Sequence, residues 1–218
     1  MADRSAYRDA IRILFVLVKG ADPLAEAHPT GATYIFRGEA RLYALEFWMR
    51  NPDYLAEELL DKFDQTGSHR FLRAAEAILS SDEPDIRRLP MIRYRFGAFE
   101  QLDDALGLLR SRNLVRITGE RHGDRVLETD FLIMPAAVDL VEEIRRDFPV
   151  LEWYAQRATL VVEIAAGRGG RALKERQYEQ AEYAETQMGG VIPPIAKRVR
   201  ERLVSVDKSM LSNGVTNV

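Results

Sequence analysis

The chain has 218 residues, of which 46% are hydrophobic and 30% are charged, a composition typical of a folded globular protein rather than a disordered one. It contains no cysteine, which excludes disulfide bonds and thiolate metal ligands. Its formal net charge is −3, so the whole molecule does not attract a polyanion, and any contact with nucleic acid must depend on a local basic patch.

The first 66 residues are predicted to form an N-terminal helical region. Apolar side chains recur at helical spacing over residues 5–19, and the run 13–18 is apolar on almost every face, which predicts a helix buried in a core or an interface. Residues 21–33 contain proline and glycine and are predicted to form a loop. Residues 38–50 and 52–63 are predicted to form a helical hairpin around a core of large apolar side chains.

A change in composition at residues 64–68, with the sequence DQTGS, predicts a turn and a helix N-cap. We therefore expect a domain boundary after residue 66 and one domain over residues 67–148. Residues 149–206 are predicted to form C-terminal helices. Residues 207–218 are expected to be a disordered tail.

The most specific order of elements lies in the middle of the chain. An amphipathic helix, FEQLDDALGLLRSRN, ends at Asn113, a residue that tolerates the left-handed conformation at a helix end. Two alternating segments, LVRIT and RVLETDFLI, are joined by the polar turn GERHGD, and they predict a two-stranded ribbon. Pro135 then begins another helix, PAAVDLVEEIRRDF. This order predicts a mainly α fold that contains a winged helix-turn-helix with a small two-stranded β-wing.

Two stretches, LLRSRNLVRI and GDRVLETDFLIMPAAVDLVEEI, resemble the winged-helix regulators of the multiple-antibiotic-resistance (MarR) type. The resemblance covers residues 67–146. It implies that residues 68–81 form the first helix of the motif, residues 84–91 the second, and residues 94–97 the turn into the third. In winged helices that bind DNA, the third helix enters the major groove and the wing lies along the backbone or the minor groove.

Basic side chains surround the expected third helix and wing, where they would neutralise phosphates. The candidate DNA contacts are Arg87, Arg88, Arg93, Arg95, Arg116, Arg121, His122 and Arg125. The early turns of the same helix carry Glu100, Asp103 and Asp104, and these carboxylates would repel the phosphate-lined walls of a groove. Direct reading of bases by this helix is therefore disfavoured.

Two functions are compatible with these patterns. The first is a DNA-binding winged-helix protein that regulates transcription, with duplex DNA as its partner. The second is an acidic winged-helix subunit that binds protein partners in a larger assembly, similar to accessory subunits of chromosome-organising SMC-kleisin complexes or to middle components of multi-gene bacterial defence operons. The acidic third helix and the apolar regions around residues 7–18 and Trp48 favour the second function.

The residues do not form a pattern typical of an enzyme or a metal site. His28, His69 and His122 are far apart in the sequence and lack the spacing of metal ligands. We therefore expect no catalytic activity, no metal and no cofactor. The apolar run 10–18 is too short to cross a bilayer, and no secretory signal precedes it, so a cytoplasmic location without membrane attachment is expected.

Two apolar helices near the ends of the chain predict self-association. Residues 10–18 and residues 150–166 both carry apolar side chains on more than one face, and such faces are normally covered by a contact. Because two-fold pairing is the commonest oligomer symmetry, we expect a homodimer. Its predicted interface contains Ile13, Leu14, Leu17, Leu160, Val161 and Ile164. The alternative is that the two helices cover each other within one chain.

Overall fold

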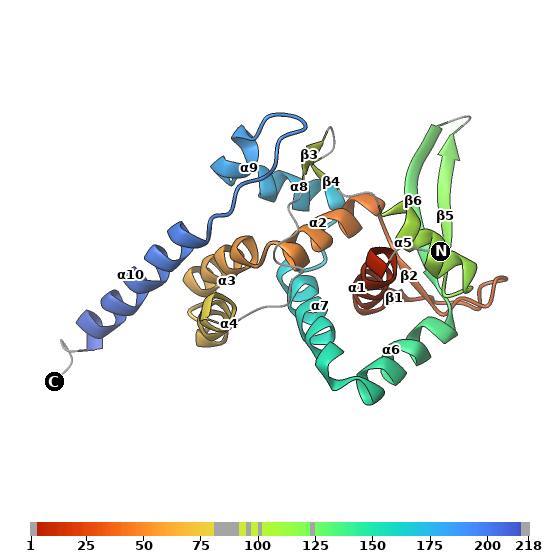
Figure 1. The fold of residues 1–218 in the computed structure, drawn as a ribbon, viewed down its shortest axis with the longest axis horizontal. Coiled ribbons are helices and arrows are strands. Elements are labelled where there is room, and N and C mark those ends of the chain that lie inside the picture. The colour runs from red at the N-terminus through yellow and green to blue at the C-terminus, as the bar shows by residue number, and fades with distance from the viewer. Residues whose placement is uncertain (1–3, 81–91, 95–96, 100–101, 123–124, 215–218) are drawn as a thin grey trace.

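The structure is a computed structural model that describes residues 4–80, 92–94, 97–99, 102–122 and 125–214. It is mainly helical and contains a small antiparallel sheet, which confirms the predicted fold class at this level (Figure 1). The helices are α1 (Arg4–Gly20), α2 (Glu39–Arg50), α3 (Pro52–Thr66), α4 (His69–Ser80), α5 (Asp103–Ser111), α6 (Pro135–Asp147), the 3-10 turn η2 (Pro149–Leu151), α7 (Glu152–Ala165), α8 (Gly170–Tyr178), α9 (Ala181–Glu185) and α10 (Ala196–Gly214). The strands are β1 (Asp22–Pro23), β2 (Tyr34–Phe36), β3 (Ile92–Tyr94), β4 (Gly97–Phe99), β5 (Val115–His122) and β6 (Arg125–Ile133).

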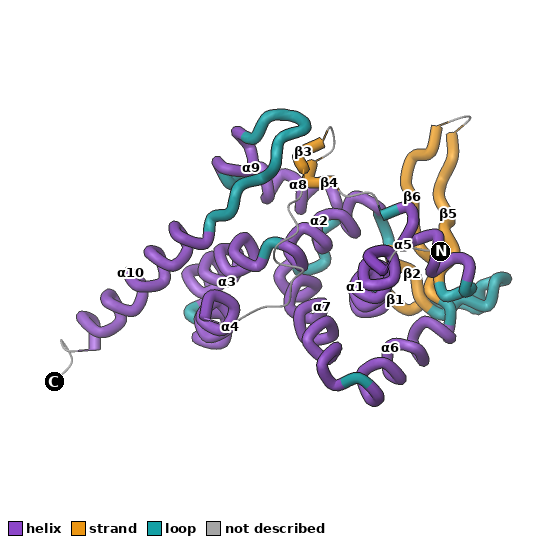
Figure 2. The backbone as a smooth tube through the Cα atoms, viewed as in Figure 1, coloured by secondary structure: helices purple, strands orange, loops and turns teal. Residues whose placement is uncertain are grey.

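The main sheet is built around the hairpin of β5 and β6 that the sequence predicts. Its strand order is β1-β2-β6-β5, and all neighbours are antiparallel. At the base of the hairpin both faces are covered: Val115, Phe131 and Ile133 belong to the main core, and Leu132 on the other face packs with Ala32 and Met134 in a small second cluster. Figure 2 shows the hairpin projecting beyond the surrounding helices. Strand β2 was not predicted, because it is only three residues long and pairs with a distant part of the chain.

Helix α1 lies at the centre of the fold. It contacts α5, α6 and α7, and also α2 and β2. This explains why its sequence is apolar on almost every face: several elements cover it at once. The resemblance to MarR-type regulators implies that residues 68–81 are the first helix of the motif and accompany its third helix. The structure corrects this assignment, because α4 packs against α3 and it is α1 that packs against α5.

The predicted dimer interface is buried within one chain. Helices α1 and α7 pack against each other, and Phe15 stacks on Tyr154 with ring centroids 5.9 Å apart. Of the six side chains predicted to form the interface, five are at most 1% exposed, namely Ile13, Leu14, Leu17, Val161 and Ile164, and Leu160 is partly buried against the same core. This corrects the predicted interface, because these five side chains already have intrachain neighbours on every side and cannot face a second copy of this fold.

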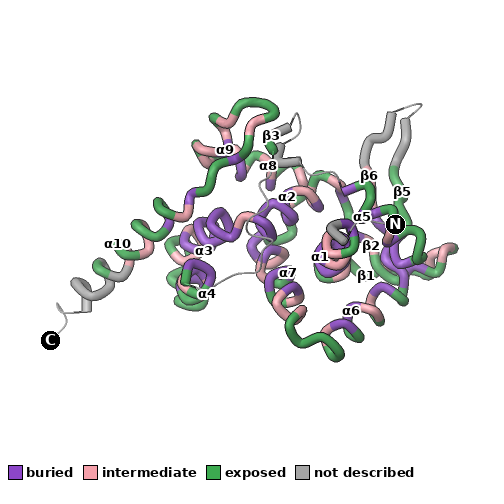
Figure 3. Tube along the Cα trace, in the orientation of Figure 1, coloured by how far each residue is buried: buried purple, intermediate pink, exposed green. Residues whose placement is uncertain are grey.

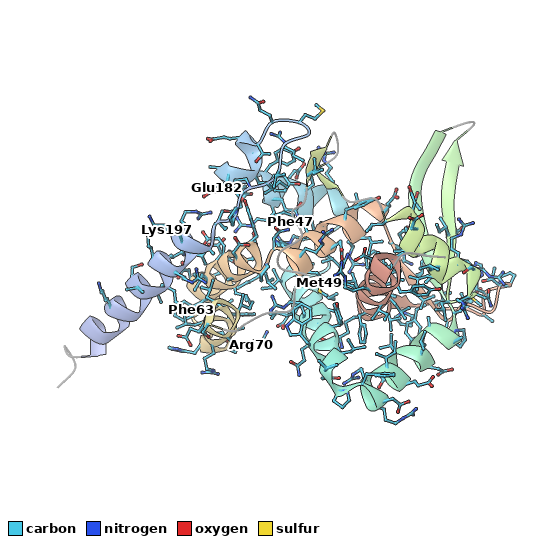
Figure 4. All side chains as sticks on the ribbon, in the orientation of Figure 1. Phe47, Met49, Phe63, Arg70, Glu182 and Lys197 are labelled. Carbon is cyan, nitrogen blue, oxygen red and sulfur yellow. The ribbon has the colours of Figure 1, made fainter. Side chains whose placement is uncertain are left out.

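Helices α2 and α3 follow one another with a bend between them, and they do not fold back on each other as the predicted hairpin would; the helix that packs along α3 is α4 (Figure 1). Asn51 separates the two helices and Pro52 begins α3. The ring of Phe47, which Figure 4 labels, packs edge to face with the rings of Tyr54 and Tyr183, with centroids 4.9 and 5.2 Å apart. Side chains from both sides of the expected boundary at residue 66 belong to one continuous apolar core. Strands β2 and β6 likewise pair across that boundary.

Helix α10 is held on α3 mainly by charge. Ile195 and Val199 are buried, Arg198 pairs with Glu57 at 2.7 Å, and Arg202 pairs with Glu57 at 2.9 Å. Beyond these contacts the helix presents mostly exposed positions (Figure 3). It continues to Gly214, so residues 207–214 are helical and not the disordered tail that the sequence suggests. Lys, Met and Leu in this stretch are good helix formers.

A buried ion pair connects α1 to α2. Arg12 and Glu46 are both 0% exposed, and Arg12 Nε donates to Glu46 Oε1 at 2.6 Å. Arg12 Nη1 also donates to Asp9 Oδ1 at 2.6 Å. Arg50, which is 3% exposed, lies close to the same groups, and burial lowers its pKa to about 10. The junction therefore holds more buried arginines than carboxylates.

Candidate nucleic-acid interface

The predicted DNA-contacting residues fall in separate parts of the structure. Arg87, Arg88 and Arg95 lie outside the described residues. Arg121, His122 and Arg125 lie at the far end of the hairpin, where Arg121 is opposite Val126 and His122 is opposite Arg125. The backbone therefore brings these three basic residues together at the most projecting part of the sheet.

Arg93 has a structural role instead of the predicted DNA contact. Its Nη1 donates to the carbonyl oxygen of Ala184 at 2.5 Å and to that of Thr186, and its guanidinium lies over the ring of Tyr178, 5.2 Å from the centroid. Its backbone also pairs with Gly189 and Gly190. The side chain thus links β3 to the loop after α9. This corrects the prediction, because the donors of Arg93 already serve backbone acceptors within the chain.

Arg116 is exposed at the start of the hairpin, beside two arginines that the sequence analysis did not select. Helix α5 ends at Ser111, and Asn113 has a φ of 52°, which turns the chain sharply into β5. This turn brings Arg110, at the end of α5, and Arg116, on β5, to the same surface depression. Arg112 lies between them in the chain, at the helix C-cap, and all three are exposed. We call Arg110, Arg112 and Arg116 the arginine corner. Its signal in the sequence is the string RSRNLVR, three arginines around a helix stop.

The arginine corner differs from most other arginine sites in this protein. Arg145 pairs with Glu142 and Glu152, Arg176 with Glu58, and Arg202 with three carboxylates of α3. Among the residues that the structure describes, no carboxylate pairs with Arg110, Arg112 or Arg116, and Arg116 Nε donates only to the amide oxygen of Asn113, at 3.1 Å. The charge of the corner is therefore available to an external anion.

The other end of α5 is acidic. Asp103 and Asp104 are exposed in its first turn. Their negative charges interact favourably with the positive end of the helix macrodipole, as the positive charge of Arg110 does with the negative end. Burial raises the pKa of Glu39, and Asp103 adds to this effect. Burial, Glu39 and Asp103 together raise the pKa of Tyr43 to about 12. The start of α5 therefore has a negative potential. The macrodipole does not account for Arg116, which lies on a strand.

Surface hollows are found at two places among the described residues. One is an open depression of about 540 Å³ at the arginine corner, lined by Gly107, Arg110, Ser111, Asn113, Val115, Arg116 and Ile117. The other is a groove of about 580 Å³ between α1, α6 and α7, with an apolar floor that includes Phe15 and Val138. In the groove Arg145 is paired with two glutamates and Lys19 is the other cationic side chain, whereas the depression has two arginines, Arg110 and Arg116, without carboxylate partners among the described residues.

Within the described ranges, no group of three or more histidine or carboxylate side chains is placed to hold a metal ion. In the same residues, each helix is either too short or too polar to cross a bilayer.

No protein-family model, curated protein or solved structure matches this chain. The likeness to MarR-type regulators thus depends on residue patterns and not on a detectable relative.

Proposed function

We propose that this protein is a winged-helix-like DNA-binding protein, with a role in regulating transcription, that holds duplex DNA by its phosphates. The observation that carries the proposal is the arginine corner, three exposed arginines without carboxylate partners among the described residues, at the base of a projecting hairpin. Such side chains displace condensed counterions from a duplex, which supplies most of the affinity in sequence-independent binding.

The order of the elements supports a winged-helix-like unit. Helix α1 contacts both α2 and α5, and the strand between α1 and α2 joins the edge of the hairpin that follows α5. In this arrangement α5 is the helix next to the wing, and residues 51–102 are an insertion between α2 and α5. The backbone carries Arg121, His122 and Arg125 to the end of the hairpin, away from the corner.

The distribution of charge along α5, acidic at its start and basic at its end, indicates how the duplex is held. The exposed carboxylates of Asp103 and Asp104 repel phosphates near the start of the helix, whereas Arg110 and Arg112 attract them at its end. Insertion of the start of α5 into the major groove is therefore unfavourable. The contacts are expected to go to the backbone, which fixes position without reading sequence.

The test is a fluorescence anisotropy titration of a labelled duplex at several salt concentrations. Each phosphate contact contributes about −0.9 to the slope of log K against log salt, so replacing Arg110, Arg112 and Arg116 by Gln should reduce the slope by about 2.7. A matched control replaces Arg73, Arg146 and Arg171 by Gln. These residues are exposed on α4, α6 and α8, and the change in net charge is the same.

Two results would contradict the proposal. If the unmodified protein does not bind duplex DNA at low salt, the protein is not a DNA-binding protein, and the hypothesis of a protein-binding subunit is favoured. If the corner variant and the control variant lose affinity equally, binding depends on net charge and the arginine corner is not the interface.

A further inference from the structure

Gly107 occupies a position in α5 where glycine has no evident structural purpose. It lies in the middle of the nine-residue helix, on the exposed face. A glycine inside a helix is less favourable than alanine, because it loses more backbone entropy on folding and has no side chain to pack. A glycine here therefore needs a reason outside the stability of the helix.

Other glycines of the chain have reasons within the fold. A Cβ on Gly170 would lie 2.6 Å from Ala40 Cβ and from the backbone nitrogen of Arg41, and a Cβ on Gly20 would lie 2.7 Å from the ring of Phe36. Gly67 has a φ of 67°, which favours glycine at the end of α3. A Cβ on Gly107 would have no atom within 4 Å, and its φ is not in the left-handed region.

Gly107 also lines the depression at the arginine corner. Arg110 is three residues further along α5, so it lies on the same face about 4.5 Å along the helix axis. Arg116 borders the depression from β5. The missing side chain thus leaves an opening on α5 with Arg110 and Arg116 on two sides. Asp103 and Asp104 are one turn earlier on the same face, on the side away from Arg110.

We propose that the sugar-phosphate backbone of a duplex crosses α5 directly over Gly107, with its phosphates held by Arg110 and Arg116. A Cβ at this position would stand between the helix and the duplex. Glycine allows the close approach of a backbone to a bound ligand, and the two arginines make a polyanion the ligand that fits this opening. This inference rests on the proposed function, because it names the point of closest contact in the same interface.

The test compares Gly107→Ala and Gly107→Gln with the unmodified protein in the anisotropy titration. A Cβ at this position meets no neighbour in the chain, and Ala and Gln both favour a helix more than Gly does, so the thermal unfolding midpoint should stay the same or rise. Duplex affinity should fall in the order Gly, Ala, Gln, with a loss of about tenfold or more for Gln because an overlapping side chain must be accommodated. The salt slope should not change, since all arginines remain.

A matched control is Ala172→Gln, which adds a similar side chain at an exposed helical position on α8 and should leave affinity unchanged. If the unmodified protein does not bind a duplex, the proposed function fails and the inference fails with it. If the unmodified protein binds and Gly107→Gln binds equally well, the inference alone is wrong, and Gly107 then serves another contact, such as a protein. A loss of affinity with a reduced salt slope would also overturn it, because the effect would be electrostatic.

Discussion

Removing the carboxylate of Glu46 is expected to be among the most damaging single changes to this fold. Glu46 and Arg12 are both 0% exposed, and two guanidinium nitrogens of Arg12 contact Glu46 Oε1 at 2.6 and 2.5 Å. In Glu46→Gln, Arg12 keeps Asp9 as a carboxylate partner, but Arg50 loses the attraction of Glu46, the main influence that opposes the effect of burial on its pKa. Breaking a buried pair in this way costs about 3–5 kcal/mol.

The loss should be measured by equilibrium unfolding in urea and by thermal unfolding. Since Tm shifts by roughly 2–4 °C per kcal/mol for a chain of this size, Glu46→Gln should lower Tm by roughly 6–20 °C. The matched control is Glu175→Gln, which removes an exposed carboxylate that pairs with Arg171 at 3.0 Å on the surface of α8. Surface pairs contribute about 0–1 kcal/mol, so this variant should unfold close to the unmodified protein.

A second variant tests the physical reason. In the double variant Arg12→Met with Glu46→Leu, both buried charges of the pair are removed together and Arg50 no longer faces the positive charge of Arg12, so the double variant should be more stable than Glu46→Gln alone. The reasoning is refuted if Glu46→Gln costs less than about 1 kcal/mol, within the range of surface pairs. It is equally refuted if the double variant is the less stable of the two.

Two other predictions follow from buried groups. Val161 is 0% exposed between α1 and α7, so Val161→Asp should abolish cooperative unfolding by circular dichroism, because it buries an unpaired charge. A folded variant with only a changed mass in light scattering would instead place Val161 between two copies. The raised pKa of Glu39 means that the folded state binds its proton more tightly, so this group lowers stability as pH rises from 4.5 through the folded value. Asp103→Asn should reduce that fall in urea unfolding from about pH 4 to pH 7, and an unchanged profile would contradict the coupling.

Local patterns predicted the elements well where one short segment determines the structure. The apolar spacing of α1, the break at Asn51 and Pro52, and the stop at Asn113 each depend on neighbours in sequence, and the structure confirms them. Strand β2 could not be found in this way. Its three residues carry little pattern, and their partner strand lies about a hundred residues further along the chain.

The sequence of an apolar helix does not by itself determine whether the helix lies in a core or in an interface. The all-round apolar character of α1 is equally compatible with an interface and with a core, because both remove the same surface from water. Whether α1 lies in a core or in an interface depends on how many elements of the same chain pack against it. Here α5, α6 and α7 surround α1 within one chain, so the residues selected for a dimer became the centre of the monomer.

The sequence also does not show which basic residues are paired with carboxylates after folding. The most basic stretch in the sequence contains Lys197, Arg198, Arg200 and Arg202, yet after folding Arg198 and Arg202 face the carboxylates of α3, including Glu57. The carboxylates of α3 neutralise the charge of these arginines, so the long-range attraction of a polyanion to α10 is weak. The arginine corner has fewer basic residues in its sequence, but among the described residues no carboxylate faces it. A phosphate is attracted by those basic side chains that have no carboxylate partner after folding. The partners of each arginine in the structure therefore predict the interface better than the density of arginines along the sequence does.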